Sequence, residues 1–133
     1  MKYILMMNAM TAGDAYAGVS GWQQKDIQAH IAFMKSLTKS LGESGELVST
    51  EGLALPYQAR IVRGGKNGAP ITDGVFPETK EFLAGYWIVD VESPERAYQI
   101  AARASAAPGP GGVPLNMPIE VRQIMSGAPE EVL

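Results

Sequence analysis

The chain has 133 residues and a formal net charge of −3, with no cysteine and a single histidine. That length is enough for one domain with a buried core, and we expect residues 1–133 to form a single domain. The lack of cysteine excludes thiol catalysis, cysteine–metal sites and disulfides, and it fits a reducing cytoplasm, where we expect the protein. Mixed charges of this size give no basic surface for nucleic acid and no polybasic membrane contact.

The first third of the chain predicts a strand followed by a helix. Tyr3 to Asn8 is apolar in both alternating sets, which indicates a strand covered on both faces, and the run is too short for a signal-peptide core or a membrane span. Residues 9–18 indicate a loop. Ser20 and Gln23 have the spacing of a capping box, which predicts a helix from here to about Leu41, ended by Gly42 and Gly45. Its apolar face is formed by Ile27, Ile31, Met34, Leu37 and Leu41.

The middle of the chain predicts short strands and a hairpin. Gly45 to Leu53 and Gln58 to Arg63 are expected to be strands. The run from Gly64 to Gly68 is typical of a hairpin turn, and Ile71-Thr72 would be the short return strand. This order delivers Asp73 to the end of that return strand.

The second half predicts the longest strand, a second helix and a last strand. Phe82 to Val91 is apolar on both sides and must therefore be covered on both sides. Ser93 followed by Pro94 predicts the N-cap and first position of a helix. Residues 107–118 are rich in Pro and Gly and indicate a loop, residues 119–124 a strand, and residues 126–133 a frayed tail. The helix would pack through Ala97, Ile100, Ala101 and Ala104.

This order of elements predicts an α+β protein with a ferredoxin-like antiparallel sheet and two helices on one face. Two helices cannot cover both faces of that sheet. The other face is apolar in the first and longest strands, so we expect a second copy of the chain to cover it in a homodimer.

One stretch also resembles a known family. Thr72-Asp73-Gly74-Val75-Phe76-Pro77-Glu78-Thr79-Lys80-Glu81, followed by Gly85-Tyr86, is similar to the signature of YCII-related proteins of the DGPF type. That signature is roughly Asp-Gly-Pro-Phe-x-Glu-Thr-Lys-Glu, and Val75 stands where the family has Pro. Further likeness at Gly45–Val48, Glu51–Leu53 and Ile119–Arg122 extends the resemblance over about residues 2–124.

The resemblance implies a dimeric α+β barrel without a cofactor, in a family whose members mostly have no established activity. Related YCII proteins are proposed to use a His–Asp pair in the cleft between subunits. Family members often lie beside sigma-factor genes, which implies a regulatory role as an alternative to catalysis.

Asp73 and His30 are the candidate catalytic residues. Asp73 would face a cleft at the entry to the longest strand, and burial or a neighbouring carboxylate would bring its pKa toward neutrality. The alternative is an Asx turn in which the carboxylate only holds its own loop. His30 falls on the apolar side of the first helix, where it would either exchange protons or serve as a half-buried, hydrogen-bonded packing residue.

Glu51, Glu78, Lys80 and Arg122 are the candidate ligand-binding residues. Lys80 would neutralise an acidic ligand or keep Asp73 ionised, and Arg122 would bind a carboxylate with its planar guanidinium. For each of them the alternative is a solvated or ion-paired surface charge, which for Arg122 includes a salt bridge to Glu120 of a neighbour. A metal site built from His30, Asp73 and Glu51 has only one nitrogen ligand and no cysteine, so we expect no metal.

Three functions remain open from the sequence. The first is a cofactor-free homodimeric enzyme that carries out acid–base chemistry on an unidentified small molecule near Asp73. The second is a non-catalytic module that binds a ligand or a protein through the same cleft. The third, on fold analogy alone, is a cofactor-free monooxygenase.

Overall fold

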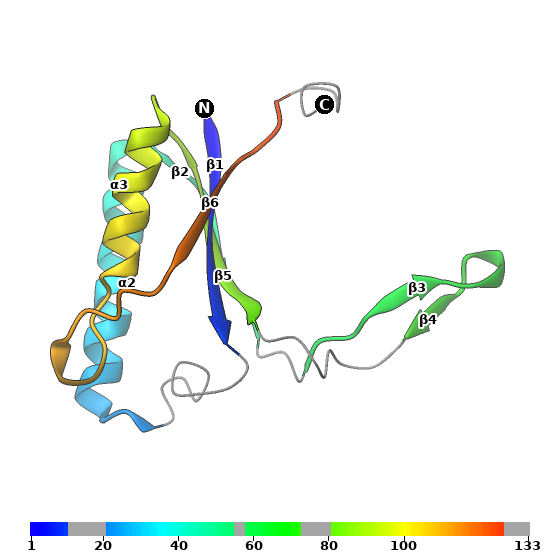
Figure 1. Cartoon of the computed structure of the whole chain (residues 1–133), viewed down its shortest axis with the longest axis horizontal. Helices are drawn as coiled ribbons and strands as arrows, with labels where there is room; N and C mark the ends of the chain where they lie inside the picture. The colour runs from blue at the N-terminus through cyan, green and yellow to red at the C-terminus, as the bar shows by residue number, and fades with distance from the viewer. Residues whose placement is uncertain (11–20, 55–57, 73–80, 127–133) are drawn as a thin grey trace.

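The computed structural model describes residues 1–10, 21–54, 58–72 and 81–126 (Figure 1). The first three elements are β1 (Lys2–Met10), α2 (Gln24–Ser44) and β2 (Leu47–Gly52). A hairpin follows, made of β3 (Val62–Gly64), the 3₁₀ turn η3 (Lys66–Gly68) and β4 (Pro70–Thr72). The chain then forms β5 (Glu81–Asp90), α3 (Pro94–Ser105), the 3₁₀ turn η4 (Pro110–Gly112) and β6 (Ile119–Gln123).

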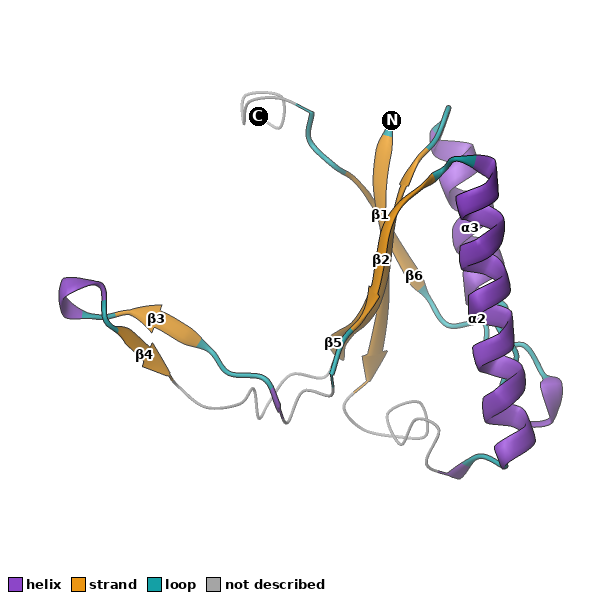
Figure 2. Ribbon diagram, turned by 180° about the vertical axis from the view of Figure 1, so that it is seen from behind, coloured by secondary structure: helices purple, strands orange, loops and turns teal. Residues whose placement is uncertain are grey.

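Four strands form one antiparallel sheet in the order β2-β5-β1-β6. This is the strand order of a ferredoxin-like fold, with the β3–β4 hairpin inserted between its second and third strands. Both helices lie against the same face of the sheet (Figure 2). The predicted fold class is therefore confirmed.

The core lies between the sheet and the two helices. Alternate residues of the two central strands, Tyr3 and Leu5 in β1 and Trp87 and Val89 in β5, are buried there. Leu37 and Leu41 cover them from α2, and Ile100 covers them from α3. As predicted, α3 presents mainly small side chains to the sheet, namely Ala97, Ala101 and Ala104.

The ends of the helices follow the predicted caps in part. Ser93 is the N-cap of α3, and its Oγ accepts a hydrogen bond from the Arg96 amide at 3.2 Å. Gly45 ends α2 in the left-handed conformation, with φ +80°, which a residue without a Cβ adopts easily. At the other end, α2 begins at Gln24 with Gln23 as its N-cap. The predicted capping box instead had Ser20 as the N-cap and Gln23 as the third residue of the helix, so Gln23 does not occupy its predicted position. Ser20 lies outside the described residues.

The predicted apolar face of α2 is wrong at one position. Ile31 is 47% exposed, whereas Leu37 and Leu41 are buried. At 100° per residue, Ile31 lies roughly 120° around the helix from Leu37, while His30 lies only about 20° from it. The buried stripe therefore passes through His30 and Phe33 and leaves Ile31 outside.

Two strands differ in extent from the prediction. β1 continues to Met10 into the expected loop, because it stays paired with β5 as far as Glu81. β3 is confined to Val62–Gly64, because β3 pairs only with the three residues of β4. The predicted turn is confirmed, with Asn67 and Gly68 at φ +61° and +77°. Figure 1 shows this hairpin projecting from the main sheet, on the side away from the helices.

Candidate functional site

The sheet has an open face opposite the helices. Residues that pair directly across an antiparallel sheet point to the same side, and Ile4 pairs with Ile88 while Met6 pairs with Tyr86. These four half-buried residues alternate with the core residues of β1 and β5, so they point away from the helices. Figure 2 shows both α-helices on the opposite side of the sheet.

Two of the sequence-predicted site residues lie on the rim of this open face. Glu51 of β2 pairs with Tyr86, and Arg122 of β6 pairs with Ile4. They are therefore on the same side of the sheet but at opposite edges. Arg122 Nε is 3.9 Å from Glu120 Oε2, with side chains 70% and 52% exposed, which makes this a weak surface ion pair.

A hollow of about 220 Å³ lies beside Glu51, at the end of the sheet where β2 stops. The residues with polar side chains in its lining are Thr38, Thr50 and Glu51. Thr38 lies on α2 and Thr50 pairs with Trp87 of the core, so the hollow lies on the helix side of β2, and Glu51, whose side chain points to the open face, borders it. Its apolar wall is formed by Met7, Met34, Ala84, Tyr86 and Trp87, with Gly52 and Gly85 completing the lining. A mainly apolar hollow with two hydroxyl-bearing side chains suits a small ligand with few polar groups.

The backbone at Glu51 is held close to β5. Thr50 Oγ1 donates a hydrogen bond of 2.9 Å to the Tyr86 carbonyl. Gly85 is buried, and a Cβ at this position would lie 3.0 Å from the Glu51 carbonyl oxygen. The close approach of the two strands therefore depends on glycine at residue 85.

A second hollow, of about 320 Å³, lies where β5 begins. It is lined by Asn8, Ala9, Glu81, Met117, Pro118, Ile119 and Glu120. Glu81 directly follows Lys80 in the chain. Asp73, Glu78 and Lys80 themselves lie outside the described residues, in the segment that joins Thr72 to Glu81.

His30 lies on the other side of the sheet, within the helical layer. Its Nδ1 is 3.0 Å from the Pro108 carbonyl oxygen, which can only accept, so Nδ1 carries the proton. Its ring meets that of Trp22 edge-on, with centroids 5.6 Å apart and planes at 85°. The structure does not bring His30 together with Glu51 or Arg122. These contacts match the packing alternative, and a catalytic role for His30 stays a prediction.

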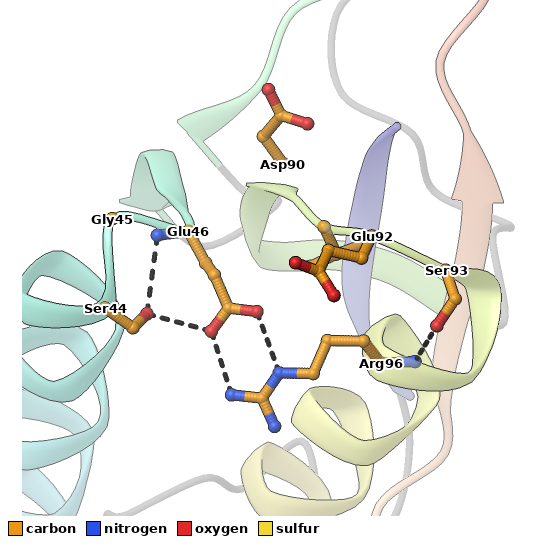
Figure 3. Close-up of a pocket in the computed structure, with 8 residues that line it drawn as sticks. Ser44, Gly45, Glu46, Asp90, Glu92, Ser93 and Arg96 are labelled. Atoms are coloured by element: carbon orange, nitrogen blue, oxygen red, sulfur yellow. Dashed lines mark hydrogen bonds and ion pairs between the residues drawn. The ribbon is translucent and has the colours of Figure 1, made fainter.

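Sequence reasoning missed a larger polar pocket at the opposite end of β2. It measures about 550 Å³ and is lined by Ser44, Gly45, Glu46, Asp90, Val91, Glu92, Ser93 and Arg96 (Figure 3). The antiparallel pairing of β2 with β5 places the start of β2 beside the end of β5, where α3 begins. No local motif signals this meeting of residues that lie far apart in the chain.

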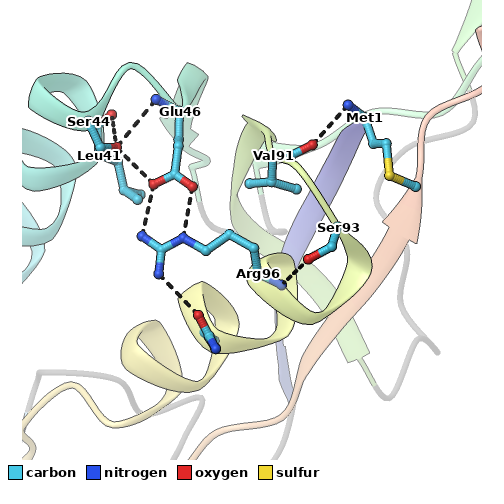
Figure 4. Close-up of polar contacts among 8 residues, drawn as sticks. Met1, Leu41, Ser44, Glu46, Val91, Ser93 and Arg96 are labelled. Carbon is cyan, nitrogen blue, oxygen red and sulfur yellow. Dashed lines mark hydrogen bonds and ion pairs between the residues drawn. The ribbon is translucent and has the colours of Figure 1, made fainter.

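Glu46 and Arg96 form a clamp across this pocket (Figure 4). Arg96 Nε and Nη2 each donate a 2.8 Å hydrogen bond to the two Glu46 carboxylate oxygens, and Ser44 Oγ donates another at 2.8 Å. The Arg96 hydrogen bonds lower the pKa of the Glu46 carboxyl, outweighing burial, which raises it. The same pairing raises the pKa of Arg96. The clamp thus joins β2 to α3 through two fully ionised groups.

Within the described residues, no group of three or more His, Cys, Asp or Glu side chains is arranged to hold a metal ion. Neither of the described helices is long and apolar enough to cross a membrane.

Comparison with known proteins identifies one domain family. The family model of the YCII-related domain matches residues 1–113, which includes Glu51, the signature stretch and all of the main sheet except β6. The comparison with curated proteins gives no match. The match is to the YCII-related domain as a whole, so the DGPF type remains a prediction.

Proposed function

Because the chain belongs to the family of YCII-related domains, we propose that it is a homodimer, of the DGPF type, that binds a small molecule in the hollow beside Glu51. The observation that carries the ligand site is the hollow of about 220 Å³, whose lining combines an apolar wall with Thr38, Thr50 and Glu51. A space of this size suits a molecule smaller than a typical drug. We place the protein in the cytoplasm, in line with its lack of cysteine.

The homodimer is supported by two features on the open side of the sheet. The first is the apolar centre of the open face, formed by Ile4, Met6, Tyr86 and Ile88. The second is the hairpin that projects on the same side, with Val62 56% and Ile71 46% exposed. An isolated two-stranded hairpin is at best marginally stable in water. A second copy seated on the open face would cover both features.

The proposed chemistry is acid–base catalysis by Asp73 without a cofactor, with Glu51, Glu78, Lys80 and Arg122 binding the ligand. Asp73 belongs to the segment that leads into β5, and the second hollow lies at the start of that strand. We propose that Asp73 lies at the mouth of this hollow, where a carboxylate can take a proton from a bound molecule.

A non-catalytic binding module is the competing function, and one observation favours it. Glu51 is exposed, so its carboxylate is well hydrated in the single chain. A hydrated carboxylate suits ligand recognition better than proton transfer, which gains from desolvation.

A thermal-shift screen of small polar molecules tests the ligand site. A ligand in the hollow should stabilise the wild type and lose most of its effect on Glu51→Gln. The matched control is Glu43→Gln, since Glu43 is an exposed glutamate of α2 with only a 4.0 Å surface ion pair to Lys39. At a concentration of 100 times the Kd, a ligand stabilises its protein by about 2.7 kcal/mol. A ligand that stabilises all three proteins equally would refute the Glu51 site.

Asp73→Asn then separates an enzyme from a binding module. Each ligand found in the screen is incubated with protein and followed by NMR. If Asp73 is the acid–base group, the wild type converts the ligand and Asp73→Asn still binds it but converts it roughly 10²-fold more slowly. If the wild type leaves every bound ligand unchanged, the protein is a binding module.

A further inference from the structure

The rim of the open face carries charges at diagonally opposite corners. The strand pairings define two rows across the face: Glu51, Tyr86, Met6, Glu120 in one, and Ser49, Ile88, Ile4, Arg122 in the next. The four apolar residues fill the centre, and the polar residues occupy the corners. Glu51 and Arg122 therefore lie on opposite edges and in adjacent rows, with the apolar centre between them.

Two copies packed through this face can be related by a two-fold axis in one of two orientations. An axis near the strand direction places the β2 edge of each copy over the β6 edge of the other. Tilted until it is perpendicular to the line joining Glu51 and Arg122, it brings Glu51 over Arg122 of the partner subunit, twice in each dimer. An axis across the strands instead places β6 over β6, so that Arg122 faces Glu120 of the partner subunit.

The charges favour the first orientation. Glu51 makes no ion pair with any residue in the described part of the chain. Covering the face would desolvate this carboxylate, which is unfavourable without a cation. Glu120, in contrast, already has Arg122 of its own chain beside it. The second orientation would therefore leave Glu51 uncompensated.

Other cations within the described part of the face do not serve this purpose. Lys2 is on the same side of β1 as Ile4 and Met6, but it pairs with Asp90, near the end of the sheet that is away from Glu51. Arg122 is 70% exposed and held only by a 3.9 Å contact, so it is available to a second copy. Packed sheets lie about 10 Å apart, a gap that long Glu and Arg side chains can bridge from opposite sides.

We propose that Arg122 of the partner subunit pairs with Glu51, so that a residue of each copy neutralises the carboxylate that borders the other copy's hollow. This inference rests on the proposed homodimer and specifies its geometry: β2 of one subunit lies over β6 of the other. The planar guanidinium can bind the Glu51 carboxylate through two hydrogen bonds.

Charge exchange tests the pairing by sedimentation velocity over a range of concentrations. Glu51→Arg and Arg122→Glu should each weaken dimerisation by about 10-fold or more, because each places like charges together. The double variant Glu51→Arg/Arg122→Glu should restore the dimer to within about 3-fold of the wild type. The control is Glu120→Arg/Arg122→Glu, which should not restore it. Rescue by this control and not by the Glu51 double variant would overturn the proposal in favour of β6 over β6.

A further variant, Ile88→Glu, tests the homodimer independently of the ion pair. Ile88 is in the apolar centre, so this variant should sediment as a folded monomer, with folding checked by circular dichroism. If Ile88→Glu dissociates the dimer while the Glu51 double variant gives no rescue, the homodimer stands and the ion pair is refuted. A wild type that is monomeric at micromolar concentration would refute the homodimer and the pairing together.

Discussion

The clamp between Glu46 and Arg96 should make a measurable contribution to stability. Its two 2.8 Å hydrogen bonds are charge-assisted and bidentate, and they link residues 50 positions apart. The Glu46 side chain is 17% exposed, while that of Arg96 is 35% exposed, so solvent screens part of the attraction. We therefore expect a coupling of about 1 kcal/mol, between the values for surface pairs and for buried charged hydrogen bonds.

A double-mutant cycle of Glu46→Gln and Arg96→Met measures this coupling. Arg96→Met should be the more destabilising single change, by about 1–2 kcal/mol, because it leaves the Glu46 carboxylate without its cation and beside Asp90 and Glu92 in the same pocket. For a domain of this size, that corresponds to a Tm lower by about 3–8 °C. Adding Glu46→Gln to Arg96→Met should recover part of the loss, since the uncompensated charge is then removed.

The pH dependence provides an independent check on the clamp. Arg96 holds the pKa of folded Glu46 below its ordinary value of about 4.3. The stabilisation is therefore fully present above about pH 4.3 and is lost as the pH falls through the folded pKa. The stability difference between wild type and Glu46→Gln should be constant between about pH 5.5 and 8 and shrink below about pH 4. A double variant whose loss of stability at pH 7 equals the sum of the two single losses would refute the clamp.

Two further predictions concern single positions in the same framework. Ser93→Ala removes the oxygen that accepts a hydrogen bond from the Arg96 amide, so it should lower the free energy of unfolding by about 1 kcal/mol in urea titrations. Ser93→Asp should restore that stability. Equal urea midpoints for all three proteins would show that the cap is unimportant. Gly85→Val puts a Cβ 3.0 Å from the Glu51 carbonyl oxygen, so it should lower the free energy of unfolding by about 1–3 kcal/mol. Amide hydrogen exchange should accelerate more in β2 than in β6. Exchange rates unchanged in both strands would contradict the close approach of β2 and β5.

Most of the fold could be predicted because it depends on local patterns. The two-sided apolar character of β1 and β5 indicated central strands, and Ser93 with Pro94 located the start of α3. The exposure of Ile31 shows where local pattern is insufficient. Residue spacing alone is compatible with Ile31 on the apolar face of α2. The face that is actually buried depends on how α2 is rotated about its axis against the sheet, which spacing does not specify.

The site was less predictable because it depends on register between distant strands. Glu51 and Arg122 could each be proposed from sequence, but their shared face follows from pairing through β5 and β1. The register between β2 and β5 shifts between Leu47 and Ser49. Because of this irregularity, counting alternate residues from Glu46 assigns the Glu51 side chain to the wrong face of the sheet. The same long-range register created the clamp, which no motif had signalled.

The two ends of β2 are held in different ways, and this separates stability from function in the fold. At its start, Glu46 is fixed to α3 by the ionic clamp, and the backbone of Asp90 donates to the Glu46 carbonyl at 2.8 Å. At its end, Thr50 secures the strand to Tyr86, but the Glu51 carboxylate has no counter-ion among the described residues. A charged group left without a partner is unfavourable once it is covered. The start of β2 is therefore fixed by contacts within the chain that stabilise the fold. The carboxylate without a counter-ion lies at the other end of β2, where we propose that a ligand and a second copy bind.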